Sequence, residues 1–181
     1  MKLKNKIFDY VRSKQPERSA RFPHLDQPLK IIILYESDVL ERNDNIKTIR
    51  QELLRRQMDV TMWGFVEKKE INTLILPQSR ILGVGDYNFF GKPRDYVLTD
   101  LQAEHYDLLI DLTTHPMLPL RYLAMYTDAD FKVGMNLGEG VHDMLISLPD
   151  FSPEQSDQAQ IEASWLYQEI MKFITTIKSN D

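Results

Sequence analysis

Two polar turns of the chain carry side chains that could do acid–base chemistry or hold a polar ligand. One follows the apolar run at residues 29–35, and the other follows the apolar run at residues 106–112. A carboxylate shielded from water has a raised pKa and can act as a base near neutral pH. Asp38 is the candidate catalytic base. The candidate ligand-binding residues in and beside the two turns are Glu36, Ser37, Asp111, Thr113, Thr114 and His115.

Each of these residues also has a structural interpretation. Asp38 could cap the helix that follows it. Asp111 could accept backbone hydrogen bonds from the next turn, and Thr114 or His115 could cap a helix that starts at Pro116. Structural networks perturb carboxylates as readily as active sites do. The residue types therefore favour structural roles for both aspartates.

A nucleotide cofactor is not expected. Dinucleotide binding requires glycines directly after the first strand, where the backbone approaches the pyrophosphate. The first turn here has no glycine and carries two carboxylates, which would repel a phosphate at a helix N-terminus. The run GVGD at residues 83–86 follows a later strand and lacks the third glycine. Walker sequences, serine-hydrolase elbows and metalloprotease helices are absent as well.

A metal site is not expected either. The four histidines stand apart in the sequence without the spacing of metal ligands, and there is no cysteine. The lack of cysteine also excludes disulfides and a cysteine nucleophile. The adjacent His142 and Asp143 are interpreted as a surface pair at a strand end.

Hydrophobic patterning predicts alternating strands and helices. The run at residues 29–35 is apolar on both faces, which is typical of a central strand in a parallel sheet. The other expected strands lie at residues 59–66, 80–84, 106–113, 129–134 and 141–148. The first expected helix of the domain follows the first polar turn and ends near Gln57. Three more are expected at residues 68–76, 99–105 and 116–126, and a last helix begins at the capping sequence of Ser152 and Pro153. Its apolar stripe of Ile161, Trp165, Ile170, Phe173 and Ile177 should pack on the sheet.

This order of elements predicts an α/β fold, a three-layer Rossmann-like sandwich with a mostly parallel sheet. The expected strand order is 3-2-1-4-5 plus an edge strand, with residues 1–28 as a basic helical arm and linker and 29–181 as the α/β domain. Ligands of such sheets lie beyond the carboxyl ends of the strands where the order reverses, between the first and fourth strands. Both polar turns belong to that position.

The first segment is basic and the remainder is acidic. Residues 1–21 carry a charge of +5, so the rest of the chain carries −10. Residues 2–14 form a helical pattern with Leu3, Ile7, Tyr10 and Val11 on one face. Such an arm could meet an acidic surface on a partner, or lie on the acidic body of its own or a neighbouring subunit.

The partner expected from these features is a second copy of the chain or another protein. Contact would be through the arm or through the aromatic loop at residues 87–96. We do not expect nucleic acid as a partner, because the body is acidic. No apolar run is long enough to span a membrane, and the basic start lacks the apolar core and cleavage site of a signal peptide. We expect a cytoplasmic protein.

Residues 29–148 resemble the N-terminal Rossmann-like half of the glycosyltransferases that add heptose to lipopolysaccharide. The similarity lies in the strand YDLLIDL at residues 106–112, in ADFKVG at residues 129–134, and in the turn Ser37-Asp38-Val39-Leu40. The resemblance implies a Rossmann-like fold and places Asp38 at the position of that family's catalytic base. The second domain, which holds the sugar nucleotide in that family, has no match here, so we expect no transferase activity from these residues alone.

The chain as a whole is similar to a small bacterial family of uncharacterised proteins. The segments RFPHLDQPLKIIIL, DVTMWGF, DYNFFGKP and LPLRYLAMYTDADFKVG carry this second resemblance, which implies no activity. We expect a non-catalytic binding or interaction protein built on a half-glycosyltransferase-like domain. The alternative is a small enzyme that acts on a polar metabolite, using Asp38 and the turn at residues 113–115.

Overall fold

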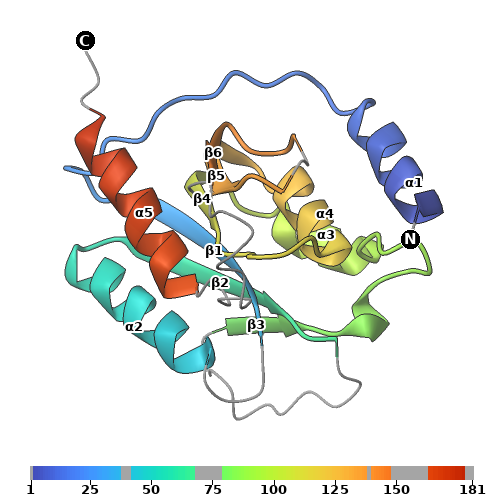
Figure 1. Ribbon diagram of the computed structural model, residues 1–181, viewed down its shortest axis with the longest axis horizontal. Coiled ribbons are helices and arrows are strands. Elements are labelled where there is room, and N and C mark those ends of the chain that lie inside the picture. The colour runs from blue at the N-terminus through green and yellow to red at the C-terminus, as the bar shows by residue number, and fades with distance from the viewer. Residues whose placement is uncertain (1, 38–41, 68–78, 138–139, 148–162, 178–181) are drawn as a thin grey trace, which may run out of the picture.

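A six-stranded parallel sheet forms the centre of the computed structural model (Figure 1), which describes residues 2–37, 42–67, 79–137, 140–147 and 163–177. The strand order is β3-β2-β1-β4-β5-β6. The strands are β1 (Lys30–Glu36), β2 (Asp59–Phe65), β3 (Ser79–Leu82), β4 (Tyr106–Asp111), β5 (Ala129–Met135) and β6 (Met144–Ile146). The Rossmann-like α/β class and the predicted strand order are confirmed, with β6 as the edge strand.

Strand β1 occupies the middle of the sheet because both of its faces are apolar. Ile31 and Ile33 belong to one hydrophobic core, and Ile32 and Leu34 belong to the other. All four side chains are fully buried. A strand with no polar face is stable only between two covering layers, which is the arrangement of a parallel sheet.

Helices cover both faces of the sheet and make three layers (Figure 1). Helices α2 (Arg42–Arg55) and α5 (Ala163–Thr176) pack on one face, and α3 (Asp95–Leu101) and α4 (Leu118–Tyr126) pack on the other. A single turn of 3-10 helix, η1 (Val84–Asp86), follows β3. In the part of the chain that the structure describes, no helix has both the length and the apolar character needed to cross a membrane.

Helix α3 differs from the prediction in its start, and helix α5 differs in the face that it packs. The helix expected at residues 99–105 is α3, which begins at Asp95, directly after the extended Arg94. In α5 the buried side chains are Leu166, Tyr167, Ile170, Met171 and Ile174, whereas Phe173 and Ile177 of the expected stripe are exposed. The apolar residues of α5 cover more than one face, so composition alone could not identify the packed one. The helix expected at residues 68–76 and the capping sequence at Ser152 lie outside the described residues.

The N-terminal helix α1 (Lys2–Arg12) packs on α4 through a residue that lies outside its predicted apolar face. Its buried anchor is Phe8, whose ring meets the ring of Tyr122 edge-on at 4.9 Å between centroids. The guanidinium of Arg121 lies 4.2 Å from the centre of the same Phe8 ring. Leu3 and Tyr10, which belong to the predicted apolar face, are 64% and 65% exposed. The most deeply buried side chain of α1 is therefore Phe8, which the predicted apolar face does not include.

The linker after α1 runs along the amino end of β5 and contacts its own chain. Arg18 donates to the carbonyl oxygens of Ala129 at 2.9 Å and Asp130 at 3.1 Å, and it pairs with the carboxylate of Asp143. The amide of Arg21 donates to the carbonyl of Asp130 at 3.0 Å. The basic linker is thus held by backbone and carboxylate oxygens of the acidic body.

The docking of α1 can be tested by replacing its anchor. We expect Phe8→Ala to lower the free energy of unfolding by roughly 3 kcal/mol, because it removes a fully buried ring. The matched control is Leu3→Ala on the same helix, which should change the free energy by less than about 0.5 kcal/mol because Leu3 is exposed. Urea denaturation of the two variants measures both values. Equal losses in both would contradict the observed packing face.

Candidate functional site

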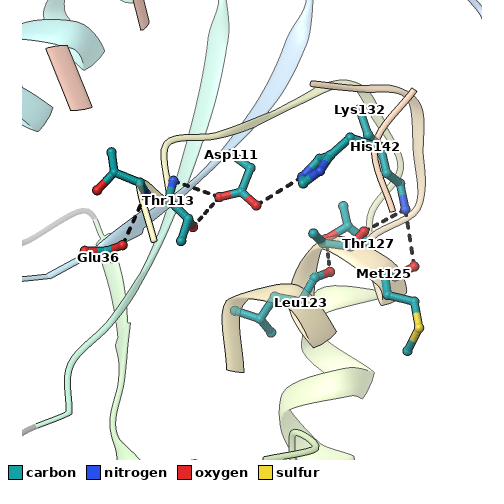
Figure 2. Close-up of polar contacts among 10 residues, drawn as sticks. Glu36, Asp111, Thr113, Leu123, Met125, Thr127, Lys132 and His142 are labelled. Carbon is teal, nitrogen blue, oxygen red and sulfur yellow. Dashed lines mark hydrogen bonds and ion pairs between the residues drawn. The ribbon is translucent and has the colours of Figure 1, made fainter. Parts of the chain in front are cut away.

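The two polar turns meet at the carboxyl edge of the sheet because β1 and β4 are parallel neighbours. Leu34 of β1 is in register with Asp111 of β4. Glu36 and Ser37 therefore extend just past the end of β4, beside the turn that begins at Thr113. Figure 2 shows Asp111 between this turn and a segment that follows β5.

Asp111 is the centre of a buried hydrogen-bond network. Its side chain is 4% exposed. The Oδ1 atom accepts hydrogen bonds from the backbone amide of Thr113 at 3.0 Å and from the hydroxyl of the same residue. The Oδ2 atom lies 3.1 Å from Nε2 of His142 (Figure 2). Both carboxylate oxygens are therefore engaged within the protein, which agrees with the structural interpretation of Asp111.

His142 is buried rather than on the surface, so the interpretation of His142 and Asp143 as a surface pair was wrong. The His142 side chain is 2% exposed. A carboxylate only accepts hydrogen bonds, so Nε2 of His142 must carry the proton that it shares with Asp111. The other ring nitrogen, Nδ1, is buried and has no hydrogen-bond partner among the described residues.

Gly134 of β5 makes room for the contact between Asp111 and His142. A Cβ atom at this position would lie 2.8 Å from Nε2 of His142 and 3.1 Å from Cβ of Asp111. Real Cβ atoms essentially never approach another atom as closely as the 2.8 Å to His142, and the 3.1 Å to Asp111 is also unusually tight. A glycine inside a strand commonly marks such an approach. The absence of a side chain here is thus a condition for the Asp111–His142 pair.

Glu36 and His115 form a second pair beside the first. Nδ1 of His115 lies 3.0 Å from Oε1 of Glu36, and the amide of Thr114 donates to the same oxygen at 3.3 Å. Glu36 is 7% exposed, whereas the His115 side chain is 55% exposed. The carboxylate is therefore inside the protein, and the imidazole is at the rim with Nε2 turned away from Glu36.

The two remaining candidates are Ser37 and Asp38. Ser37 donates its amide to the carbonyl of Phe65 at 2.8 Å, and its buried hydroxyl has no partner in the described part of the chain. Asp38, the candidate base, lies outside the described residues. The structure thus brings together all the ligand-binding candidates of the two turns except Ser37, for which it shows no side-chain contact with the others.

The helix after the second turn begins later than predicted. The N-cap residue of α4 is Met117, which makes no side-chain capping bond. Pro119, rather than Pro116, is the proline of the first helical turn. Capping by Thr114 or His115 was therefore a wrong prediction, because their turn is held instead by Asp111 and Glu36.

A buried lysine in β5 joins this strand to the end of α4. Lys132 of β5 is 3% exposed, and its Nζ atom donates to the carbonyl oxygens of Ala124 at 2.8 Å and Met125 at 3.2 Å (Figure 2). These are carbonyls of the last turn of α4, which lack helical partners. Burial, with a smaller contribution from the nearby Arg18, lowers the pKa of Lys132 to about 8.

Within residues 2–37, 42–67, 79–137, 140–147 and 163–177, no group of three or more histidine, aspartate or glutamate side chains is placed to hold a metal ion. The histidines at the site each pair with one carboxylate instead.

Comparison with protein families identifies the family but not an activity. A family model matches residues 2–158. The chain belongs to DUF6913, a family of unknown function. The resemblance of the whole chain to an uncharacterised family is therefore confirmed. Among curated proteins, no sequence matches the chain.

Two solved structures of the E. coli heptosyltransferase WaaC are similar to this DUF6913 protein. The structure with ADP is 13% identical, covers 77% of this chain and 46% of the enzyme, and has a TM-score of 0.45. The structure with ADP-2-deoxy-2-fluoro heptose is 12% identical, covers 83% of this chain and 50% of the enzyme, and has a TM-score of 0.48. The chain spans about half the length of that enzyme. The heptosyltransferase class is also the one that the sequence resembles.

Sequence reasoning missed two residues of the buried network, His142 and Gly134. His142 follows Asp111 by 31 positions, so no local pattern links the two. Gly134 did carry a signal, since it interrupts a run of larger strand residues. That signal indicates a close approach but does not name the side chain that approaches.

The space left by Gly134 gives a direct test of the network. We expect Gly134→Ala to lower the free energy of unfolding by about 1–3 kcal/mol, because the new methyl group displaces His142 or Asp111. The control is Gly85→Ala, where an added Cβ meets nothing within 4 Å. Chemical denaturation compares the two, and a tolerated Gly134→Ala would contradict the close approach.

The buried lysine predicts a pH dependence of stability. The folded-state pKa of Lys132 is about 8 and the ordinary value is 10.5, so between these pH values the unfolded chain binds more protons than the folded one. Stability should therefore rise with pH across this window, and the cost of charging Lys132 is fully present below it. Lys132→Met should lack this rise, so the stability difference between the two proteins should change by on the order of 1 kcal/mol per pH unit. Urea denaturation on both sides of pH 8 measures the difference, with Lys172→Met, a change at an exposed lysine, as the control that should retain the rise.

Proposed function

We propose that this DUF6913 protein is a non-catalytic binding protein that holds a polar ligand at the carboxyl ends of β1 and β4. The observation that carries the proposal is the state of Asp111. The carboxylate at the end of a central strand is the group best placed for acid–base work, but both of its oxygens are engaged by Thr113 and His142. With these hydrogen bonds, Asp111 is better suited to holding its neighbours in position than to transferring protons.

The chemistry of the rim indicates the class of ligand. The first turn has no glycine, and the buried carboxylate of Glu36 lies at the end of β1, directly behind His115 of the rim. This arrangement disfavours phosphate, which binds where backbone amides and positive charge converge. Hydroxyl and amino groups are the complementary partners of carboxylate and imidazole. We therefore expect a ligand rich in hydroxyl or amino groups rather than a nucleotide.

His115 is the residue proposed to contact this ligand. Its Nδ1 atom is oriented by Glu36, and more than half of its side chain is exposed. An imidazole fixed through one nitrogen presents the other in a defined direction, which lowers the entropic cost of binding. Thr114 stands in the same turn and shares the Glu36 oxygen through its amide.

One observation favours the alternative of a small enzyme. In many enzymes a carboxylate orients a histidine that acts as the general base, and Glu36 and His115 form such a pair. In that case His115, with Glu36 behind it, would act together with Asp38 on a polar metabolite. The enzyme and the binding protein differ in one measurable respect, because only the enzyme changes the ligand.

A thermal-shift screen tests the proposal. The probes are free sugars, polyamines, amino acids and nucleosides, with nucleoside phosphates and sugar nucleotides as the disfavoured set. A ligand at about one hundred times its dissociation constant adds about 2.7 kcal/mol of stability, which corresponds to roughly 5–10 °C in the melting temperature. His115→Ala should abolish the shift given by a hydroxyl- or amine-bearing probe without lowering the melting temperature of the free protein.

The chain offers a matched control for that variant. His105 has 52% of its side chain exposed and lies 3.0 Å from Asp128, so it resembles His115 in exposure and pairing. It precedes β4 and is therefore at the opposite edge of the sheet. His105→Ala should leave the ligand shift unchanged. Turnover of the stabilising probe, followed by mass spectrometry, would favour the enzyme, and a shift from nucleoside phosphates alone would contradict the proposed ligand class.

A further inference from the structure

Helix α1 uses one face for docking and leaves an apolar stripe on another. Phe8 is fully buried against α4, whereas Leu3 and Tyr10 are 64% and 65% exposed. Leu3, the partly buried Ile7 and Tyr10 are spaced at i, i+4 and i+7, so they align along the helix. The stripe is therefore fixed in position on a docked helix.

A second exposed apolar element is the tip of the loop between η1 and α3. Phe89 is 78% exposed and Phe90 is 38% exposed. The tip is held in shape, because the side-chain oxygen of Asn88 accepts hydrogen bonds from the amides of Phe90 at 2.9 Å and Lys92 at 3.1 Å. The preceding Tyr87 is buried, with its ring edge-on to the ring of Phe65. The two phenylalanines are thus presented by a structured turn.

The helix and the loop tip are neighbours and share a basic border. The ammonium of Lys4 lies 4.8 Å from the centre of the Phe89 ring, and Figure 1 shows the segment after η1 passing beside the amino end of α1. Further lysines on or next to the two elements are Lys2 and Lys6 of α1, Lys14 with its ammonium 5.7 Å from the Tyr10 ring, and Lys92 after the loop tip. Asp9 is the one acidic residue within α1. We call the exposed residues Leu3, Tyr10, Phe89 and Phe90, with these lysines, the aromatic–basic surface.

The physical properties of this surface fit an anionic lipid bilayer. Aromatic and aliphatic tips beside lysines match the interface of a membrane, where rings lie at headgroup level and ammonium groups reach the lipid phosphates. A helix face and a loop tip project outward. A lipid bilayer can take up projecting side chains without a binding pocket of matching shape. The lysines of this surface supply the attraction to lipid phosphates.

A second copy of the chain fits this surface less well. In a two-fold dimer the same patch lies on both subunits. That arrangement would place the lysines of one subunit against those of its partner, and like charges at an interface oppose association.

We propose that the aromatic–basic surface binds the headgroup region of anionic membranes and attaches the protein to them peripherally. The binding is independent of the ligand site at the carboxyl ends of β1 and β4. It uses Leu3, Tyr10, Phe89 and Phe90 as apolar contacts and the lysines as partners of lipid phosphates.

The test is flotation of the full-length protein with lipid vesicles. One set contains phosphatidylcholine alone, and the other contains phosphatidylcholine with phosphatidylglycerol at roughly one lipid in three, which gives a strongly negative surface. The protein should float with the anionic set only. Lys2→Glu with Lys6→Glu should weaken binding by about 25-fold or more, given about fivefold for each basic residue near the surface. Leu3→Ser with Tyr10→Ser should weaken it by at least about tenfold.

Matched controls lie on helices α2 and α5, which cover the other face of the sheet. Lys47→Glu with Lys172→Glu reverses two exposed lysines, and Leu54→Ser with Phe173→Ser removes two exposed apolar side chains. Both controls should bind vesicles as the unchanged protein does, and circular dichroism should show all variants folded.

Three results would overturn the proposal. The first is no flotation with anionic vesicles. The second is flotation that the control variants reduce as much as the surface variants do. The third is self-association, measured by analytical ultracentrifugation, that the surface variants abolish while vesicle binding is absent, which would identify the surface as a contact between copies.

Discussion

The carboxylate of Asp111 closes its own turn and holds a residue 31 positions away, and the geometry of the candidate site depends on it. One oxygen closes the turn after β4 through Thr113, and the other holds His142 ahead of β6. The closed turn in turn places the amide of Thr114 against Glu36 at the end of β1. Removing one partner of such a buried network leaves the others without hydrogen bonds, which costs more than the lost bond itself. A single side chain therefore fixes how the ends of β1, β4 and β6 face one another.

This arrangement separates the buried part of the site from its exposed part. Asp111 and His142 are nearly inaccessible, and their bonds are directed at each other and at Thr113. Glu36 is also buried, but the histidine that it orients stands at the rim. Preorganisation of a rim residue by buried partners is what both binding and catalytic sites require. The difference lies in the central carboxylate, whose two oxygens are already engaged by Thr113 and His142, and this is the reason for proposing binding rather than catalysis.

The sheet could be predicted well from the sequence, whereas the buried faces of the helices could not, and both results have physical reasons. A strand such as β1, apolar on both faces, can only lie between two layers, and successive β–α units can only add parallel neighbours. The turns at the ends of β1 and β4 followed from that order. By contrast, the buried faces of α1 and α5 depend on which apolar residues find a partner, and helix periodicity alone does not distinguish Phe8 from Leu3 or Ile174 from Phe173. The pairing of Asp111 with His142 depends on Gly134 in a third strand, so it arises only when the sheet is assembled.

The basic arm and the candidate site are joined through the segment between β5 and β6. Asp143 accepts a hydrogen bond from the amide of Lys132 at 2.8 Å and pairs with Arg18 of the linker. Its neighbour His142 reaches Asp111 on the other side of β5. Two adjacent residues of this segment are therefore held, Asp143 by the arm and His142 by the network of the site. Since Arg18 also lies close enough to lower the pKa of the buried Lys132, the arm acts on the interior of the domain as well as on its surface. The charge asymmetry of the sequence thus has a structural counterpart: part of the positive charge neutralises the body at Asp143, and the lysines of α1 remain exposed on the helix that Phe8 holds in place.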